Sequence, residues 1–455
     1  MTNLIVETSK YLMLFLFACY TYECFSSFRN ISEEKKNRIF ARQMVLMYLI
    51  HLDGYLAVYA VTDDIRMILF YALQVLFAAV TLLCYRLIYQ KSSRLLANNM
   101  CMLMLIGFLM LTRLSDRLAI RQFAIAAISM VATLFLPFVV RRASFLKKLT
   151  WLYAAVGAAG LGAVALLGDT DYGAKLAIEF SGISIQPSEF VKIIFVFFVA
   201  CIFSEKNDFA RVCIATAVAA VHVLILVLSR DLGGALIFFV TYLVMLYVAT
   251  GKLFYFAGGI LAGSISAVIA YNLFSHVQVR VIAWQDPLSV IDNEGYQISQ
   301  SLFAIGTGGW FGMGLYQGMP NRIPVVEQDF IFSAISEELG GVFAICLLMV
   351  CISCLLMMFN VAMQMKEMFY KLIALGLGTV YGFQVFLTVG GVTKFIPSTG
   401  VTLPFVSYGG SSLLSTMALF AIMQGLYMLR QDRGEAHGKK SGSKGKNGEK
   451  EDKKS

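Results

Sequence analysis

Thirteen long apolar runs follow one another along this chain, and each could cross a bilayer as a helix of about 20 residues. Lipid offers the backbone no hydrogen-bond partners, so such runs span a membrane as helices that satisfy their own amides. We therefore predict an all-α polytopic membrane protein. The predicted spans are 8–27, 43–62, 65–85, 96–113, 121–140, 149–168, 189–204, 211–229, 233–250, 253–274, 338–359, 370–391 and 411–429.

Composition excludes a soluble protein. Apolar residues make up 58% of the 455 residues and charged residues only 14%, whereas soluble domains carry about 25% charged residues. No long polar stretch precedes residue 431, which leaves no room for a folded domain outside the membrane. The cysteines lie mostly in apolar runs and the four histidines are scattered, so we predict no metal site built from them.

Lysine and arginine gather in alternate connections, and this bias marks the cytoplasmic side of a membrane protein. The basic connections include 29–42, 86–94 and 141–148, together with the tail that follows Leu429. This pattern predicts a cytoplasmic C-terminus and, with thirteen spans, an external N-terminus. The tail 431–455 is rich in Lys, Gly, Ser and Glu, and we expect it to be disordered. A topology signal is favoured over attraction to anionic lipid headgroups as its role.

Two polar clusters lie at the external ends of predicted spans 189–204 and 233–250. The first is Gln-Pro-Ser-Glu at 186–189, in which Glu189 shares a helix face with Lys192. Charges that enter a bilayer are costly unless they serve a function, although a pair that only holds the bundle together is the alternative. In the second cluster Arg230 could hold a phosphate and Asp231 could cap the next helix, and a purely structural turn is equally consistent.

The third cluster is the external connection 275–337, and connections of this length are usually functional. It includes a glycine run at 306–314, which we do not interpret as a nucleotide-binding loop, because no strand precedes it and no terminal lysine follows. The fourth cluster, 397–412, contains two prolines and three glycines. Such irregular backbone at membrane depth is tolerated only against protein or a wet cavity.

These four clusters, in this order and spacing, resemble the SEDS family (shape, elongation, division and sporulation), whose best-known members are FtsW and RodA. The resemblance covers about residues 100–430 and includes Asp-Leu-Gly after Arg230, Gly-Tyr-Gln at 295–297, and Leu-Pro-Phe-Val-Ser-Tyr-Gly-Gly-Ser-Ser at 403–412. Family members usually have ten spans. The resemblance therefore implies a ten-helix core at 95–430, with residues 1–94 as three additional N-terminal helices and 431–455 as the tail.

The resemblance implies a peptidoglycan glycosyltransferase of the bacterial cytoplasmic membrane. SEDS proteins polymerise lipid II at the outer face of that membrane, usually beside a class B penicillin-binding protein that supplies transpeptidation. We expect lipid II, that partner and membrane lipids as binding partners, and no nucleic acid. No cofactor is certain, although Mg²⁺ or Mn²⁺ could share the charge of the diphosphate.

The chemistry needs a carboxylate that takes a proton from the acceptor hydroxyl and cations that stabilise the leaving diphosphate. The family's essential aspartate corresponds here to Val290, flanked by Asp286 and Asp292. We favour Asp286 because it keeps the Asp-Pro pair, although Asp before Pro often caps a turn. The candidate cations are Lys192, Arg230, Arg280, Arg322 and Lys394. The further candidates for substrate binding are Glu189, Tyr296, Gln297, Asp329, Thr399, Ser407, Tyr408 and Ser411.

Two other functions compete with this one. A lipid II flippase would also use intramembrane ion pairs and broken helices, but its site should lie near the midplane, whereas the polar clusters gather on one side. A scaffold for a penicillin-binding protein has little reason to place a charged pair and many glycines at a cavity mouth. The sequence does not distinguish roles in division, elongation or sporulation.

Overall fold

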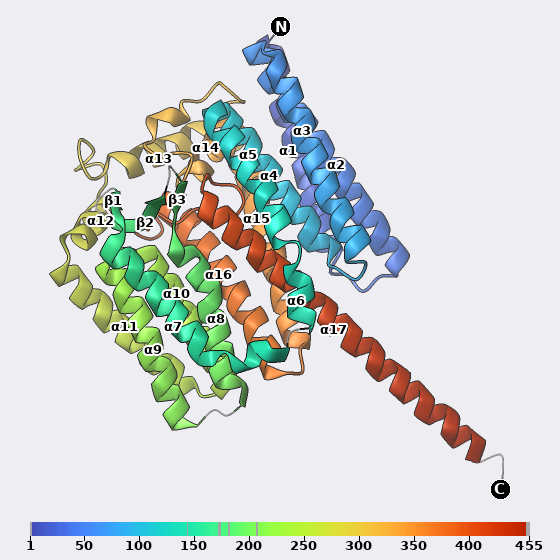
Figure 1. Cartoon of the computed structure of the whole chain (residues 1–455). Coiled ribbons are helices and arrows are strands. Elements are labelled where there is room, and N and C mark those ends of the chain that lie inside the picture. The colour runs from blue at the N-terminus through green and yellow to red at the C-terminus, as the bar shows by residue number, and fades with distance from the viewer. Residues whose placement is uncertain (1, 143, 172–173, 181–182, 206–207, 452–455) are drawn as a thin grey trace.

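The computed structural model describes residues 2–142, 144–171, 174–180, 183–205 and 208–451. Thirteen helical stretches in this part of the chain are long and apolar enough to cross a membrane, which confirms the predicted polytopic α-helical fold (Figure 1). The helices that form them are α1 Thr2–Ser26, α2 Glu33–Thr62, α3 Ile65–Ile88, α4 Arg94–Leu114, α5 Asp116–Thr133 with α6 Leu136–Arg142, α7 Thr150–Leu167, α8 Pro187–Glu205, α9 Phe209–Leu228, α10 Leu232–Thr250, α11 Leu253–Leu273, α15 Gly341–Gln364, α16 Met368–Val392 and α17 Gly410–Glu451.

Helix ends differ from the prediction where polar residues extend a span or glycine breaks one. Helix α2 begins at Glu33, ten residues before the predicted apolar run, because its first turns lie outside the apolar part and carry charged side chains. The predicted span 338–359 is divided at Gly340, which has φ 91°. Only glycine adopts such a backbone readily, so α14 (Ile331–Leu339) ends there and α15 starts in a new direction.

The long connection 275–337 is folded rather than irregular. It contains α12 (Ser275–Gln285), α13 (Tyr296–Gly308), the short 3-10 helix η2 (Pro320–Arg322) and α14. It lies at the same end of the bundle as the N-terminus, while the C-terminus and the 3-10 helix η1 (Ser144–Lys148) lie toward the opposite end (Figure 1). This arrangement agrees with an odd number of spans.

Two parts of the chain differ from the predicted all-helical core and disordered tail. Between α7 and α8 lie three short antiparallel strands, β1 (Asp169–Asp171), β2 (Ala174–Phe180) and β3 (Ile183–Ile185). These strands are too short to give a pattern that could be recognised in the sequence. Helix α17 continues to Glu451 and projects away from the body of the molecule (Figure 1), where we expected irregular structure from residue 431. The extension continues the backbone hydrogen bonds of the buried part of α17. The polar composition of the tail does not reveal that the helix continues.

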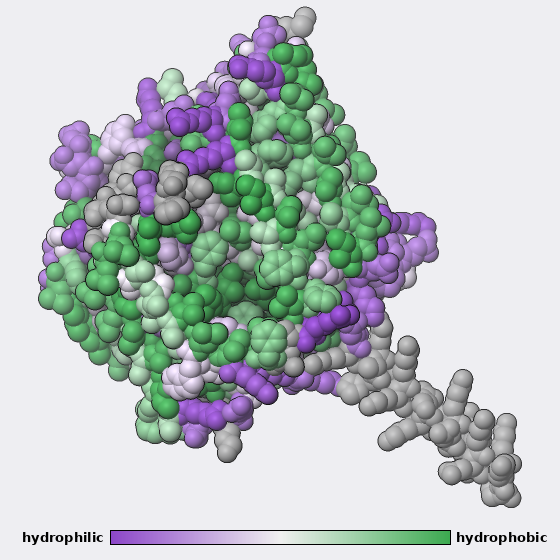
Figure 2. Space-filling model, viewed as in Figure 1, coloured by the Kyte–Doolittle hydropathy of each residue, from purple (hydrophilic) through white to green (hydrophobic). Residues whose placement is uncertain are grey.

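The additional helices α1–α3 pack on the ten-helix core through α4 and α15. A buried polar chain crosses this contact, because Tyr20 Oη donates to Asn99 Oδ1 at 2.9 Å and Asn99 Nδ2 donates to Ser353 Oγ at 2.7 Å. Lipid cannot satisfy such groups, so they favour one packing register. Apolar side chains cover a broad band of the surface in Figure 2, with hydrophilic residues gathered at its two ends, as a membrane-spanning bundle requires.

Candidate functional site

A polar cavity of about 70 Å³ brings the four sequence clusters together at the end of the bundle where α8 and α10 begin. Segments as far apart in the chain as Gln186 and Thr402 meet there, because both helix starts face the loop that follows α16. The cavity is lined by Gln186, Ser188, Glu189, Lys192, Arg230, Asp231, Gly234, Ile237, Arg280, Thr399, Gly400, Val401 and Thr402.

The ion pair of α8 lies in the wall of this cavity. Lys192 Nζ lies 2.9 Å from Glu189 Oε1 and donates to Gln384 Oε1 on α16 at 3.0 Å. Glu189 Oε2 accepts from Ser415 Oγ on α17 at 2.9 Å. Both charged residues are buried, at 8% and 5% exposure. A buried pair with this many hydrogen bonds is structurally demanding, because removing either partner leaves an uncompensated charge.

The turn between α9 and α10 supplies a cation and a cap. Arg230 has φ 64°, and Asp231 Oδ1 accepts from the Gly234 amide at 2.7 Å, which caps α10. Burial raises the pKa of Asp231. A side chain at Gly233 would come within 2.4 Å of Val401 Cγ2, so glycine is needed for the close approach of this turn to the loop 399–402.

Arg280 reaches the cavity from α12 and donates to the Ser398 carbonyl at 3.0 Å. Burial lowers its pKa, and the nearby charges of Asp329 and Asp231 oppose that shift. Burial in turn raises the pKa of Asp329 to about 6, while Arg280 acts to lower it. Asp329 therefore lies near enough to Arg280 for the charge of each residue to act on the pKa of the other. The buried Thr399 Oγ1 lines the cavity and has no hydrogen-bond partner within the described residues.

The two aspartates proposed as the base lie elsewhere. Asp286 and Asp292 are exposed in the connection between α12 and α13, and among the described residues neither lines the cavity. Asp286 ends α12, and its Oδ1 accepts from the Ser289 amide at 3.4 Å. It thus has the geometry of a turn cap, the structural alternative considered for it, and its catalytic role stays a prediction.

Five other predicted site residues hold loops in place. Gln297 Nε2 donates to the Pro324 carbonyl at 2.9 Å. Ser407 Oγ accepts from the Leu403 amide at 2.8 Å, and Ser411 Oγ accepts from the Gln186 amide at 3.0 Å. Lys394 and Tyr408 make such contacts through their backbones. The Lys394 carbonyl accepts from Trp284 Nε1, and the Tyr408 amide donates to the Glu327 carbonyl.

Two more candidates lie at exposed positions. Tyr296 is the first residue of α13 and is 40% exposed. Arg322 is exposed in η2.

The prediction missed Gln384 and Ser415, which bind the two charges of the α8 pair. Both lie inside apolar spans, where a polar side chain is unusual, and that rarity is the signal that could have found them. Within the described residues no group of three or more His, Cys, Asp or Glu could hold a metal ion.

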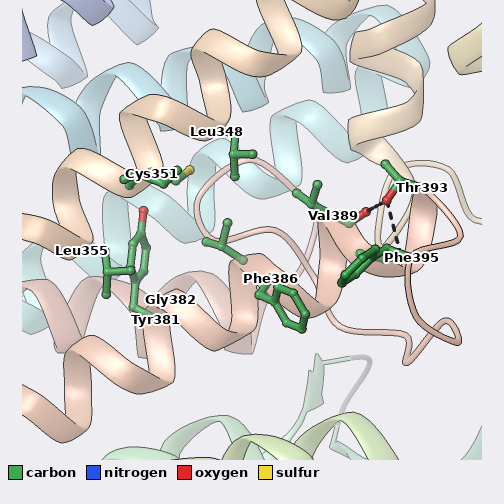
Figure 3. Close-up of a pocket in the computed structure, with 12 residues that line it drawn as sticks. Leu348, Cys351, Leu355, Tyr381, Gly382, Phe386, Val389, Thr393 and Phe395 are labelled. Atoms are coloured by element: carbon green, nitrogen blue, oxygen red, sulfur yellow. Dashed lines mark hydrogen bonds between the residues drawn. The ribbon is translucent and has the colours of Figure 1, made fainter.

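A second, apolar groove of about 390 Å³ runs between α15 and α16 (Figure 3). Leu348 and Leu355 line it from α15, Phe386 lines it from α16, and Phe395 lies at one end (Figure 3). Its lining holds no charged side chain. The groove therefore offers no charged side chain to a diphosphate.

The fold and this site define a multi-pass membrane protein with a charged cavity beside the folded connection 275–337. A family model described as a cell cycle protein of the FtsW, RodA and SpoVE type matches residues 93–431. This chain therefore belongs to that family, which confirms the SEDS resemblance. The match begins at the end of the three additional helices.

Similar proteins include the peptidoglycan glycosyltransferase RodA of Mycobacterium leprae, 39% identical over 267 residues, which are 55% of this chain and 57% of that protein. Stage V sporulation protein E of Bacillus subtilis is 36% identical over 262 residues, 55% of this chain and 70% of that protein. The chain thus spans less than two thirds of the RodA relative.

Solved structures agree on the fold. A chain from a structure described as a peptidoglycan synthase complex that coordinates polymerization and crosslinking superposes with a TM-score of 0.63 at 24% identity, over 75% of this chain and 98% of that chain. The rod shape determining protein RodA of Thermus thermophilus superposes with a TM-score of 0.55 at 23% identity, over 74% of this chain and 96% of that chain.

Proposed function

We propose that this protein is a peptidoglycan glycosyltransferase that polymerises lipid II into glycan strands at the outer face of the bacterial cytoplasmic membrane. The observation that carries the proposal is the cavity in which Lys192, Arg230 and Arg280 converge at helix starts. The reaction expels a polyprenyl diphosphate, whose growing negative charge needs fixed cations in a site shielded from water. Family membership and the named glycosyltransferase relatives support the same reaction class.

The side that carries the cavity faces outward in this proposal, so the N-terminus is external and the C-terminus cytoplasmic. Basic residues of the connections 29–42, 86–94 and 141–148 support this orientation. Lipid II would then enter from the outer leaflet with its diphosphate at the cavity and its polyprenyl chain in the bilayer.

Of the cations, Arg230 and Arg280 are the best suited to bind a diphosphate, because a guanidinium presents paired donors to phosphate oxygens. Lys192 already donates hydrogen bonds to Glu189 and Gln384. Its role is therefore to contribute positive charge to the cavity wall. A divalent cation, Mg²⁺ or Mn²⁺, would take most of its ligands from the diphosphate and water, because Mg²⁺ commonly needs only one or two protein carboxylates beside phosphates. Asp231 and Glu189 are the carboxylates in the lining.

Asp286 is the proposed general base and Asp292 the alternative. Such a base contributes about 10²- to 10⁴-fold to a rate. Catalytic contacts often tighten only in the substrate complex, so an exposed Asp286 in the ligand-free fold is compatible with this role.

The experiment gives purified wild-type, Asp286→Ala and Asp292→Ala protein lipid II and measures glycan polymer. Glu294→Ala is the matched control, since Glu294 is an exposed carboxylate of the same connection. We expect polymer from the wild type and the control and at least a hundredfold loss for Asp286→Ala. Full polymerisation by Asp286→Ala would reject the assignment. Normal polymerisation by both aspartate variants would reject the carboxylate mechanism at this connection.

A class B penicillin-binding protein is the proposed partner. One similar structure comes from a synthase complex that couples polymerization with crosslinking. The flippase alternative is less well supported, because the cavity lies at helix starts rather than at the midplane of the spans. Sided movement of lipid II without polymer would favour it. A scaffold would leave polymerisation by the complex unchanged when Lys192, Asp286 and Asp292 are replaced together.

A further inference from the structure

The N-terminal helix α1 contacts the glycine run of the external connection. Lys10 Nζ donates to the Gly312 carbonyl at 3.2 Å and pairs with Glu7 Oε1 at 2.8 Å. The rings of Tyr11 and Phe311 lie with their centroids 6.0 Å apart. The Lys10 side chain is only 10% exposed, so its ammonium is enclosed between α1 and the run rather than directed into solvent.

The packing at this contact is tight. Gly314 has φ 100°, and a side chain there would come within 2.8 Å of Val6 Cγ1. Val6 is itself buried, at 1% exposure. Glycine is therefore required at 314 both by its backbone conformation and by the approach of α1.

The other side of the glycine run is bonded to the end of α14. The Met313 amide donates to the Glu337 carbonyl at 2.9 Å and the Gly314 amide donates to the Glu338 carbonyl at 2.8 Å. Glu337 Oε1 also accepts from the Met319 amide at 2.9 Å. The run is thus held between α1 on one side and α14 on the other.

Helix α14 follows a segment that lies beside the charged site, although none of the helix's own residues is among those that line the cavity. It begins at Ile331, two residues after Asp329, whose charge acts on Arg280. Ser333 of α14 is hydrogen-bonded to Ser301 of α13 at 2.7 Å. A shift of α14 would therefore displace the adjoining segment that carries Asp329.

We propose that Lys10 is a positioning residue, which holds the glycine run and, through it, α14 and Asp329 in the arrangement that the cavity requires. The inference rests on the proposed function for its effect on catalysis. The family match covers residues 93–431, so the contact is contributed by the additional N-terminal helices. These helices therefore brace the external connection of the core.

The test measures hydrogen–deuterium exchange in the purified full-length protein, on peptides that cover 308–319 and 337–342. Loss of one charge-assisted hydrogen bond should raise local opening, and hence amide exchange there, about tenfold in Lys10→Ala. Lys10→Arg should restore slow exchange, because it keeps a cationic donor. Lys36→Ala is the matched control, since Lys36 also pairs with a glutamate three residues earlier, on α2, and should leave these peptides unchanged. Tyr11→Ala provides a second variant if Lys10→Ala does not fold, and it should also raise exchange.

Lipid II polymerisation is measured on the same samples. We expect turnover at saturating lipid II to fall several-fold in Lys10→Ala and to recover in Lys10→Arg. If amide exchange in Lys10→Ala equals that of the wild type, Lys10 does not hold the glycine run, whatever the activity of the variant. Raised exchange with normal turnover would overturn the positioning role. If the wild type makes no polymer while Lys10→Ala raises exchange, the proposed function fails and the brace stands.

Discussion

The polar cavity and the apolar groove differ in nearly every respect. The polar cavity encloses about 70 Å³ and is lined by four segments that are distant in the sequence, with five charged side chains. The apolar groove encloses about 390 Å³ and is formed by two consecutive helices and the start of the loop that follows them. The groove lies between two apolar spans, whereas the polar cavity brings charges together at a free-energy cost.

The free-energy cost of forming the groove and that of forming the polar cavity are offset by different interactions. The groove loses only packing contacts, which lipid chains or an apolar partner surface can replace. The polar cavity keeps Glu189 and Lys192 nearly buried, and their stability depends on hydrogen bonds from α16 and α17. The comparison therefore predicts large effects of substitutions in the cavity and small effects in the groove.

The largest effect is expected from Lys192→Met, which leaves Glu189 buried without its cation. Breaking a buried pair costs about 3–5 kcal/mol of unfolding free energy, measurable by SDS titration in mixed micelles. The control is Lys36→Met, because the Glu33–Lys36 pair has the same spacing but a glutamate that is 83% exposed, and surface pairs contribute about 0–1 kcal/mol. The double variant Glu189→Gln with Lys192→Met should recover part of the loss. Equal costs for Lys192→Met and Lys36→Met would contradict the burial argument.

Arg280→Ala tests whether the cavity stabilises the negative charge that develops on the leaving diphosphate. Removing one such donor typically lowers turnover about 10²- to 10³-fold, and Arg280→Lys should recover only part, because an ammonium lacks the paired donors of a guanidinium. Initial rates of lipid II polymerisation measure the effect, with Arg322→Ala as a control cation in the exposed helix η2. Similar losses for both arginines would mean that the cavity has no special role.

Asp329 predicts a pH dependence of stability. Its pKa is raised to about 6 in the folded protein, whereas an unfolded aspartate titrates near 3.9. Between these values the folded state binds more protons than the unfolded state, so stability should fall as the pH rises from about 4 to 6. SDS titrations at the two ends of this window should show the fall in the wild type and in Glu294→Gln. The fall should be smaller in Asp329→Asn, and an unchanged fall would assign it to another group.

The smallest effect is expected in the groove. Phe386→Ala removes part of one wall, but Phe386 is already 42% exposed. Polymerisation by the purified protein without a partner should stay within about twofold of the wild type, since the substitution touches no charge. A tenfold loss would show that the groove takes part in substrate binding and would remove the distinction between the two cavities.

Much of the architecture could be predicted from local sequence. Span count follows from apolar length, and all thirteen candidate spans were predicted, although α2 was started too late and α5 and α6 were taken as one helix. The folded content of 275–337 and the strands β1–β3 were not predicted, because short elements outside the membrane carry no strong periodicity. The helical extension of α17 after residue 431 was also not predicted.

The sequence alone determined that this chain has thirteen apolar segments able to span a membrane and that unusual polar residues gather at one end of them. Bilayer thickness and the cost of unsatisfied backbone impose both features locally. The tertiary structure decided which polar residues meet. It placed Glu189, Lys192, Arg230 and Arg280 around one cavity, left Asp286 and Asp292 at the surface, and joined Lys10 to the glycine run. These contacts depend on helix tilt and on packing between segments that are distant in the chain, and a short stretch of sequence carries no information about either.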